Sequence, residues 1–434
     1  MADHARSDDR AVQAQLDRFA QLSPGRDILG LERIAALMAA LGNPHLTLPP
    51  VFHVAGTNGK GSTCAFLRAA IEAAGLTAHA YTSPHLCRFN ERIRIAGSLI
   101  TDEALAPLLS TVLDAAEANA IGPSFFEATT AAALLAFSRT PADVAIIEVG
   151  LGGRLDATNI IEAPAVCGIA QLGIDHQSFL GNDAVTIAGE KAGIAKRGVP
   201  LVTMDYPDST AKKVAAVAGG VGAPLIIRKQ AWDSAPYEGK LHYRDEAGKL
   251  SVPLPRLAGD HQQRNAALAI AMIRHQSAVT IPEAALKAAM GWTEWPARMQ
   301  RLSAGPLATL APEGSEIWLD GCHNPAGAEL VADYMRQTLA GRPLSLICGI
   351  LANKDAAGIL HPFLPLIASL TAIPIPGHDH HAPSVLAAIA GTKGRTALAV
   401  DAAMRRIDTP GVVLIMGSLY LAGEVLKTND QLPD

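Results

Sequence analysis

Short apolar runs alternate with longer amphipathic segments along most of the chain. Apolar runs with the length of buried strands cover 50–56, 77–83, 143–150, 163–170, 199–204, 316–320, 343–350 and 411–417. Apolar residues recur at helical spacing over 31–41, 61–74, 102–119, 124–139, 186–196, 260–276 and 325–339. Near-continuous apolar strands are typical of parallel sheets that helices cover on both faces. The alternation therefore predicts an α/β fold with a doubly wound, mainly parallel sheet.

Two features suggest how this pattern divides into domains. Residues 240–254 break the alternation, because their polar, glycine-containing turn predicts an antiparallel hairpin. Residues 291–300 contain two tryptophans and a proline after a predicted helix, and a second α/β pattern follows them. A chain of 434 residues is long enough for two or three domains at roughly 150 residues each. We therefore expect a larger domain over 1–295 and a smaller one over 296–434.

Composition narrows the class of protein. The formal net charge is −5, whereas polyanion binders carry a basic excess, so we expect no nucleic-acid partner. The five cysteines are an odd number without C-x-x-C spacing, which disfavours a disulfide framework or a thiolate zinc site. The polar start lacks the apolar core of a signal peptide, and no apolar stretch approaches the roughly 18 residues that span a bilayer. We expect a cytoplasmic monomer without a membrane partner.

The strongest single signal is a glycine-rich segment between a predicted strand and a predicted helix, which reads GTNGKGS over 56–62. Backbone N–H groups in such a turn can approach phosphate oxygens, and the helix N-terminus adds positive potential. Lys60 would supply a charge for the outer phosphates. The standard spacing G-x-x-x-x-G-K-[ST] is not met, because Val54 replaces the first glycine and Gly61 separates Lys60 from Ser62. An ordinary strand–helix turn is the alternative, but the combined context favours nucleotide binding.

A second dense motif, IEVGLGGRLD over 147–156, follows another apolar run. Glu148 stands at the carboxyl end of that predicted strand, where parallel sheets place ligands. A carboxylate there can hold Mg²⁺, a hard cation that prefers oxygen. The glycines after it predict a tight backbone path beside a bound molecule. A solvated acid followed by a flexible turn is the alternative, which the neighbouring residues disfavour.

Three further polar groups follow predicted strands, and they are TSPH over 82–85, Asp175-His176 and DGCHNP over 320–325. Five polar clusters at strand ends indicate a site at the sheet edge. Residues 378–381 also contain three histidines and an aspartate. We interpret this segment as a polar loop and not as a metal site, because no ligand framework surrounds it.

Together these motifs resemble those of the folylpolyglutamate synthase / dihydrofolate synthase family, relatives of the Mur ligases. The resemblance rests on GTNGKGS, TSPHL followed by Arg92, EVGLGGRLDATN, the Asp175-His176 pair, GEKAGI and D-x-x-HNP, in the family's order over about residues 28–420. It implies a P-loop domain similar to the central domain of the Mur ligases and a smaller Rossmann-like domain. The modified P-loop of the family also accounts for the spacing that fails the general pattern.

The resemblance implies a nucleotide site and two metal sites. The residues implied to contact ATP, from both domains, are Asn58, Gly59, Lys60, Gly61, Ser62, Asn265, Arg298 and Asp320. One Mg²⁺ would be bound by Ser83 and Glu148, and a second by His176 beside Lys191. Lys191 resembles the family's carbamylated lysine, since carbamylation turns a repelled ammonium into an anion compatible with a metal. A solvated helix lysine is the alternative for this residue.

The resemblance also implies substrate contacts. The segments similar to the pterin-recognition segments supply Phe126, Glu127, Leu155, Asp156 and Ala157. Candidates for the incoming glutamate are Arg92, His323 and Ser418, of which Arg92 and Ser418 could equally be structural. The implied catalytic set is Lys60, His176, Lys191 and His323. Two departures stand out: Ile28 replaces an aspartate expected before LGLER, with Asp27 one position earlier, and Cys322 replaces an alanine that is common before HNP.

The implied reaction is an ATP-dependent ligation of a carboxylate and an amine through an acyl phosphate. Glutamate would be joined to dihydropteroate, which yields dihydrofolate, and to reduced folates, which yields polyglutamates. A Mur-type ligase for a cell-wall precursor and a monofunctional folylpolyglutamate synthase are the nearest alternatives, and SFFEATT and LGGRLDATN weigh against the Mur type. A P-loop kinase or switch protein would usually carry an aspartate where Glu148 stands. A folate-binding module without catalysis would not need the ATP motifs.

Overall fold

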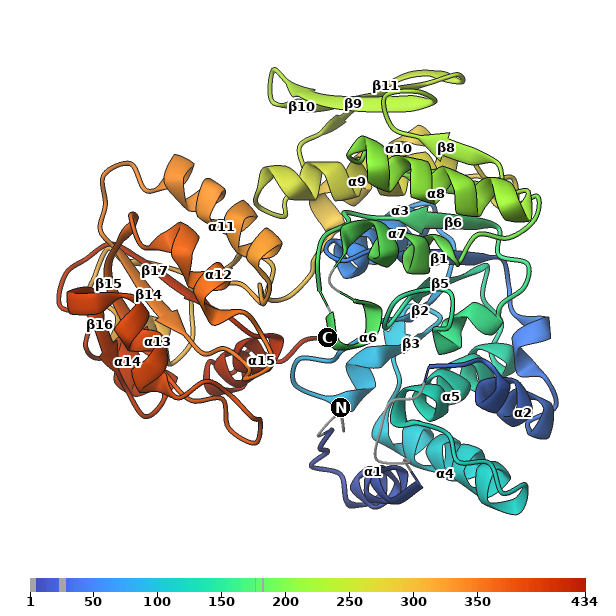
Figure 1. The fold of residues 1–434 in the computed structure, drawn as a ribbon, viewed down its shortest axis with the longest axis horizontal. Helices are drawn as coiled ribbons and strands as arrows, with labels where there is room; N and C mark the ends of the chain where they lie inside the picture. The colour runs from blue at the N-terminus through green and yellow to red at the C-terminus, as the bar shows by residue number, and fades with distance from the viewer. Residues whose placement is uncertain (1–4, 23–28, 176, 182) are drawn as a thin grey trace. The chain divides into compact units, whose positions relative to one another are not determined.

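The computed structural model describes residues 5–22, 29–175, 177–181 and 183–434, and the chain divides into two units (Figure 1). The first unit comprises Met1–Arg256 and Gln262–Thr293. The second unit comprises Leu257–His261 and Glu294–Asp434. The short segment Leu257–His261 thus belongs to the second unit, although it lies in the sequence between two parts of the first.

The first unit is built on an eight-stranded sheet with the order β4-β3-β2-β5-β1-β6-β7-β8. Its strands are β1 (Val51–Ala55), β2 (Ala78–Tyr81), β3 (Ile93–Ile95), β4 (Ser98–Leu99), β5 (Val144–Glu148), β6 (Val166–Ile169), β7 (Leu201–Thr203) and β8 (Leu225–Ile227). All neighbours from β2 to β8 in this order pair in parallel, whereas β3 and β4 add antiparallel pairs at one edge. Strand β1 lies between β5 and β6, with Val54 opposite Glu148.

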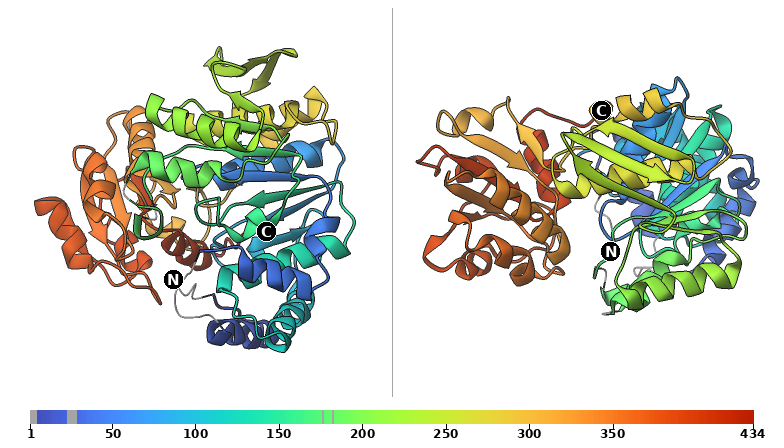
Figure 2. Two further views of the ribbon diagram at one scale, coloured as in Figure 1. Left: turned by 45° about the vertical axis from the view of Figure 1, so that its right-hand side comes forward. Right: turned by 90° about the horizontal axis from the view of Figure 1, so that it is seen from above.

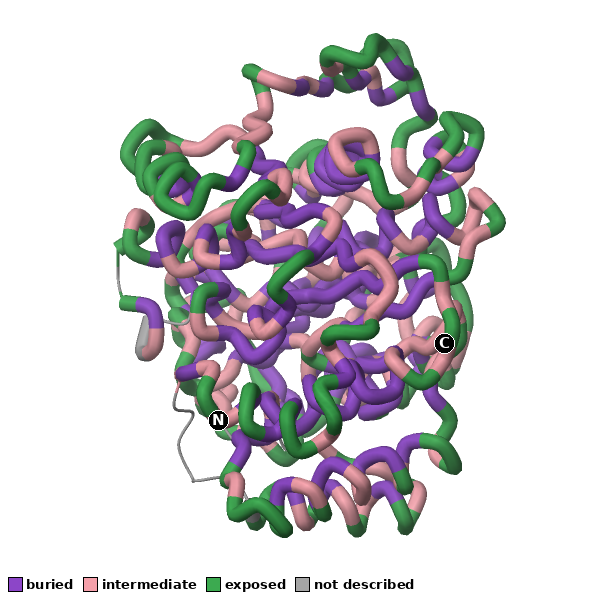
Figure 3. Tube along the Cα trace, turned by 90° about the vertical axis from the view of Figure 1, so that its right-hand side faces the viewer, coloured by how far each residue is buried: buried purple, intermediate pink, exposed green. Residues whose placement is uncertain are grey.

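Helices pack on both faces of this sheet (Figure 2). They are α1 (Arg10–Leu22), α2 (Glu32–Ala40), α3 (Lys60–Ala73), α4 (Asp102–Ala118), α5 (Phe125–Arg139), α6 (Gln177–Leu180), α7 (Ala184–Ala192), α8 (Asp208–Val221), α9 (Asp260–Arg274) and α10 (Glu283–Trp292). Val51 and Ala55 of β1 point to the face where α1, α2, α4, α5, α7 and α8 form two apolar clusters. Gly168 points to the opposite face, where a side chain at its position would overlap Met272 of α9. Figure 3 shows the buried strands between these layers.

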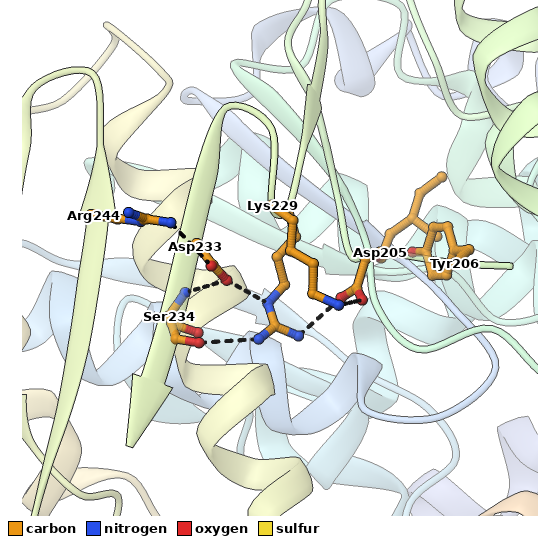
Figure 4. Close-up of polar contacts among 8 residues, drawn as sticks. Asp205, Tyr206, Lys229, Asp233, Ser234 and Arg244 are labelled. Atoms are coloured by element: carbon orange, nitrogen blue, oxygen red, sulfur yellow. Dashed lines mark hydrogen bonds and ion pairs between the residues drawn. The ribbon is translucent and has the colours of Figure 1, made fainter. Parts of the chain in front are cut away.

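A separate three-stranded antiparallel sheet is attached at the β8 side of the first unit, and it consists of β9 (Trp232–Tyr237), β10 (Lys240–Asp245) and β11 (Gly248–Pro253). Asp245 is fastened to Arg274 of α9 by two hydrogen bonds of 2.7 and 2.8 Å. A second group of ion pairs lies where β8 leads into β9 (Figure 4). There Arg228 is 2.9 Å from Asp205 and 3.4 Å from Asp233. These charges tie the small sheet to the larger one.

The second unit has a six-stranded sheet with the order β12-β13-β17-β14-β15-β16. Its strands are β12 (Gln300–Leu302), β13 (Glu316–Leu319), β14 (Leu344–Cys348), β15 (Ile367–Ala372), β16 (Gly394–Thr396) and β17 (Val412–Met416). Its helices are α11 (Pro325–Thr338), α12 (Ala356–Leu360), α13 (Pro383–Ile389), α14 (Val400–Met404) and α15 (Leu419–Thr428). Only β12 pairs in the antiparallel sense. Leu319 of β13 lies opposite Ile415 of β17, so the segments that follow these two strands begin side by side.

The predicted alternation is confirmed. Each predicted strand and each predicted helix is present, with ends shifted by a few residues. The hairpin expected over 240–254 is confirmed as β10 and β11, but its third strand, β9, was missed because Pro236 interrupts its pattern. Within the described ranges, no helix has the length and apolar character needed to cross a membrane. The five cysteines are all buried, and none of them forms a disulfide.

Candidate functional site

The glycine-rich segment after β1 forms a turn that ends at the N-terminus of α3. Gly56 has φ +151°, and a Cβ there would lie 2.9 Å from the Cβ of Ala170, so only glycine fits. Gly59 also has a positive φ, +86°, and it precedes the first helical residue, Lys60. The backbone N–H groups of Thr57 and Asn58 donate to the Gln171 carbonyl, at 2.8 and 3.1 Å. The Gln171 carbonyl therefore fixes a glycine-containing turn at the N-terminus of α3, which is the arrangement that phosphate-binding loops use.

Lys60 extends from the start of α3 toward Glu148 at the end of β5. The Lys60 ammonium is 4.0 Å from the Glu148 carboxylate and donates to the Thr57 carbonyl at 3.4 Å. The exposed fractions of the two side chains are 16% and 5%. The lysine and the carboxylate therefore lie close together in a largely buried position at the carboxyl edge of the sheet. This pairing of opposite charges joins the two motifs that the sequence singled out separately.

Asn265 of α9 lies against the same turn. A Cβ on Gly59 would overlap the Asn265 side chain, whose amide donates to Gln262 at 3.0 Å. Asn265 is 3% exposed. The structure thus places Asn265 beside the phosphate loop, although more than 200 residues separate the two in sequence.

The loop after β2 carries Ser83, and a carboxylate folds it. The Ser83 backbone N–H donates to Glu148 at 3.3 Å. The Glu91 carboxylate accepts the backbone N–H groups of Leu86, Cys87 and Arg88, at 2.7, 2.8 and 2.7 Å. Glu91 therefore holds the loop in which the Ser83 backbone contacts Glu148. The sequence reasoning missed Glu91, because nothing in the local pattern distinguishes it from a surface acid.

Arg92, a candidate for glutamate binding, lies in the interior and is 1% exposed. Its Nε donates to Nδ1 of His85 at 2.8 Å. Its guanidinium lies over the rings of Phe89 and Phe125, with 5.6 and 5.7 Å to the ring centroids. These contacts favour the structural alternative, in which Arg92 orients His85 and braces the Ser83 loop.

Lys191 lies near the end of α7 and is 4% exposed. Burial and the nearby charge of Lys60 lower the pKa of Lys191 to about 7, although Asp175 and Asp156 act in the opposite direction. The Gly153 backbone packs directly on this helix end, since a Cβ there would lie 2.7 Å from the Glu190 carbonyl oxygen. The two glycine-containing motifs are thereby brought together. A solvated lysine is wrong for this position, because Lys191 is buried.

The segments expected to contact a pterin lie together, but their two carboxylates already have partners within the protein. Phe126 lies against Gly150, where a Cβ would overlap its ring. Glu127 accepts from Arg33 at 2.9 and 3.0 Å and closes a capping box with Ser124 at the start of α5. The S-x-x-E spacing of Ser124 and Glu127 is a sequence signal for this cap that the motif search passed over.

Asp156 is 3% exposed and is held inside the loop that joins β5 to β6. Its carboxylate accepts from the Leu151 backbone at 2.8 Å and from the Thr158 backbone at 3.0 Å. Burial raises the pKa of Asp156, and these hydrogen bonds act against that rise. Ala157 is buried beside it, and Leu155 is half-buried. Asp156 therefore holds this loop together, and its charge acts to raise the pKa of Lys191.

In the second unit, Asp320 and Arg298 lie on adjoining turns. Asp320 accepts from the Met299 backbone at 2.8 Å and from the Cys322 backbone at 2.7 Å. Ala297 and Met299, on either side of Arg298, have φ values of +56° and +44°. Left-handed backbone at two non-glycine residues is strained, and such strain concentrates at functional positions. Asp320 thus holds the turn that presents Arg298.

His323 and Ser418 follow the paired strands β13 and β17. The Nδ1 atom of His323 is 2.9 Å from the Gly321 carbonyl, so the proton lies on Nδ1. Ser418 is 1% exposed and caps α15 by accepting from the Tyr420 backbone at 3.1 Å. The capping contact favours the structural alternative for Ser418.

Three residues that the sequence analysis singled out, His176, Asp27 and Ile28, lie outside the described residues. Among the described residues, no group of three or more His, Cys, Asp or Glu side chains is arranged to hold a metal ion. Within 378–381, His380 and His381 contact backbone carbonyls at 2.7 and 2.9 Å.

Comparison with known proteins finds relatives that cover most of the chain, although no family model matches it. The folylpolyglutamate synthase of Lacticaseibacillus casei is 35% identical over 413 residues, which cover 91% of this chain and 93% of that protein. The fold is similar to that of Escherichia coli FolC in complex with DHPP and ADP, with a TM-score of 0.86 and 31% identity over 96% of this chain and 97% of that one. A bifunctional folylpolyglutamate synthase/dihydrofolate synthase with Mn, AMPPNP and L-glutamate bound has a TM-score of 0.84 and 31% identity, over 97% of this chain and 99% of its own.

Proposed function

The chain belongs to the folylpolyglutamate synthase/dihydrofolate synthase family and is an ATP-dependent ligase, and we propose that it joins L-glutamate both to dihydropteroate and to reduced folates. The two reactions have the same chemistry, because in each a carboxylate is activated and then captured by the glutamate amine. The observation that carries the proposal is the 4.0 Å pairing of Lys60 and Glu148 beside the glycine turn. The pair brings a cation suited to a phosphate and a carboxylate suited to a metal ion to one edge of the sheet.

The donor set around Glu148 fits a divalent cation. Glu148 is a largely buried carboxylate, and the Ser83 loop is fixed against it by a backbone hydrogen bond of 3.3 Å. Carboxylate and hydroxyl oxygens are the ligands that Mg²⁺ prefers. Glu148 and Ser83 would hold one Mg²⁺, and Lys191 in its carbamylated form, with His176, would hold a second. When bound, such ions offset the charge that develops on the transferred phosphoryl group.

Lys191 suits carbamylation for a physical reason. A pKa of about 7 leaves a large fraction of the amine neutral near neutral pH, and only the neutral amine attacks CO₂. The product is an anion, which would remove the repulsion that Lys191 has with Lys60. Gly153 permits the close backbone packing that holds this helix end in place.

The protein's own residues have separate roles in the proposed reaction. Asn58, Gly59, Lys60, Gly61 and Ser62 bind and orient the ATP phosphates, and Lys60 stabilises the charge on the outer phosphate. The acceptor carboxylate attacks the γ-phosphate, which forms an acyl phosphate and ADP. The glutamate amine attacks the acyl carbon, and phosphate leaves. Phe126 and the loop Gly150–Ala157 supply contacts to the pterin ring.

Further candidates for nucleotide binding are Asn265 in the first unit and Arg298 and Asp320 in the second, where Asp320 fixes the strained turn around Arg298. His323 is the candidate for the incoming glutamate in the second unit. Arg92 supports the Ser83 loop through His85, and Ser418 caps α15. We also propose a monomer that acts in the cytoplasm; five buried cysteines without a disulfide suit a reducing compartment.

Product analysis tests the two-acceptor proposal. Purified protein is incubated with Mg-ATP and L-glutamate, once with dihydropteroate and once with tetrahydrofolate, and the products are identified by mass spectrometry. We expect dihydrofolate in the first reaction and tetrahydrofolate polyglutamates in the second. Product with tetrahydrofolate alone would reduce the proposal to a monofunctional folylpolyglutamate synthase. Product with neither acceptor, but with a cell-wall precursor, would indicate the Mur-type alternative.

A further inference from the structure

A histidine interrupts the apolar core in the middle of β1, three residues before Gly56. His53 is fully buried between aliphatic strand residues, and its Nε2 lies 2.9 Å from the Thr158 hydroxyl. Burial lowers the pKa of His53 to about 3, so the ring is neutral. A buried polar side chain in a core strand costs stability unless it is hydrogen-bonded, so this contact calls for an explanation beyond packing.

Thr158 carries the contact on to Asp156, and the direction of each hydrogen bond can be assigned. Both the backbone N–H and the hydroxyl of Thr158 contact Oδ1 of Asp156, while Leu151 donates to Oδ2. An ionised carboxylate only accepts, so the single hydroxyl proton of Thr158 points to Asp156. The hydroxyl must then accept from Nε2–H of His53. Nδ1 of His53 has no partner among the described residues, and as a lone pair it is the less costly orphan.

This series of hydrogen bonds ends in the loop that we assign to the acceptor. Asp156 closes that loop on itself, because its backbone N–H donates to Gly153 at 3.2 Å and its carboxylate accepts from Leu151. Gly150, at the start of the loop, lies under the Phe126 ring. The conformation of the acceptor loop therefore depends on one threonine hydroxyl and on the histidine that donates to it.

We propose that His53 and Thr158 are positioning residues for the acceptor: they fix the Asp156 carboxylate and the loop Gly150–Ala157, and so determine the affinity for the pterin-bearing substrate. The proposal rests on the proposed function, since it takes this loop as the acceptor site. Neither side chain touches substrate. Their effect reaches the acceptor through Asp156 and leaves ATP binding unchanged.

The test compares Thr158→Val, which removes the hydroxyl at constant shape, with Thr158→Ser, which keeps it. Because Thr158→Val removes a hydrogen bond to a charged group, we expect the KM for dihydropteroate to increase about tenfold. The KM for ATP stays at the wild-type value, and Thr158→Ser restores most of the acceptor affinity. His53→Leu has the same effect as Thr158→Val, with a smaller size. The matched control is Thr293→Val, which removes another buried hydroxyl, hydrogen-bonded to Ala289 at 2.6 Å.

Hydrogen exchange provides a readout that does not need turnover. In Thr158→Val the amides of Leu151 and Thr158 exchange faster than in the wild type, whereas Thr293→Val leaves them unchanged. If Thr158→Val only lowers the melting temperature, with normal loop exchange and an unchanged acceptor KM, the proposal is overturned. Equal increases in the KM for ATP and for the acceptor would also overturn it. An inactive wild type with accelerated loop exchange in Thr158→Val would contradict the proposed function and still support the role of the two residues in the loop.

Discussion

Lys60 illustrates how position, more than residue type, decides the role of a side chain at this site. It is the first residue of α3, so it combines its own charge with the positive end of the helix. Its neighbour Glu148 is largely buried, and the ion pair offsets part of the cost of burying that carboxylate. Lys287, by contrast, lies on an exposed helix surface.

Removal of the Lys60 ammonium tests the phosphate role. We expect Lys60→Ala to lower turnover by about 10³-fold, because the group offsets charge that is greatest during phosphoryl transfer. The melting temperature should change by only a few degrees, since α3 keeps its turns. Turnover is measured as glutamate-dependent release of phosphate. The control Lys287→Ala, at an exposed position, should retain wild-type activity; similar losses in both variants would argue against the assigned role.

Lys191 provides a pH-dependent prediction. Because burial lowers its pKa to about 7, the neutral amine fraction increases as the pH rises through 7, and carbamate formation increases with it. Protein equilibrated with ¹³C-bicarbonate should give a carbamate ¹³C signal that grows between pH 6 and 8. The same signal should be absent in Lys191→Gln, together with at least a 100-fold loss of activity. A signal that does not change with pH, or that persists in the variant, would contradict this assignment.

At the scale of elements, several candidate residues of the first unit lie on loops that follow strands of one sheet, and polar contacts fix these loops. Glu91 folds the loop after β2, Asp156 folds the loop after β5, and Gln171 holds the phosphate loop after β1. Each contact uses a polar side chain or carbonyl to hold backbone N–H groups. The rigid strands set the positions at which these loops begin.

Gly150 tests the loop that we assign to the acceptor. A methyl group at this position would overlap the Phe126 ring and force the ring to rotate. We expect Gly150→Ala to raise the KM for dihydropteroate about tenfold and to leave the KM for ATP unchanged. The matched control is Gly219→Ala in α8, where nothing lies within 4 Å, and it should stabilise the protein by about 0.5–1 kcal/mol. An unchanged acceptor KM in Gly150→Ala would separate this loop from the acceptor site.

The small sheet β9–β11 depends on a buried ion pair. The Asp245 side chain is 1% exposed and accepts two hydrogen bonds from Arg274 of α9. Loss of one charge leaves the other buried, so Asp245→Asn should lower the free energy of unfolding by roughly 3 kcal/mol. Asp233→Asn, at a 29% exposed side chain, should lower it by less than about 1 kcal/mol. Both values come from urea unfolding, and equal losses would show that burial of the pair is unimportant.

Much of this architecture could be predicted from the sequence, because buried parallel strands leave long apolar runs. The missed strands include β4, which has two residues, β9, which contains Pro236, and β15, whose apolar run was not recognised as a strand. The partners of the candidate residues could not be predicted in the same way. Arg33 lies 94 positions from Glu127, and nothing local to either residue indicates that they pair. The motifs therefore indicate candidate residues, while tertiary contacts decide which carboxylates are buried and paired.

At the scale of the whole molecule, the candidate residues are distributed over two units with their own sheets and cores. The first contains the phosphate loop, the residues proposed to bind metal and the acceptor loop. The second contains two candidate residues: Arg298 precedes β12, and His323 follows β13. Such a division suits a ligase with three substrates, because each substrate can be recognised by a separate set of loops.

The central claim is that the acceptor carboxylate is activated as an acyl phosphate, and isotope transfer tests it most directly. Dihydropteroate labelled with ¹⁸O in its carboxylate is incubated with the enzyme, Mg-ATP and L-glutamate, and the released phosphate is analysed by mass spectrometry. The account predicts one ¹⁸O atom in each phosphate, since the carboxylate oxygen that attacks the γ-phosphate leaves with it. Phosphate without ¹⁸O, released in step with dihydrofolate, would contradict the account.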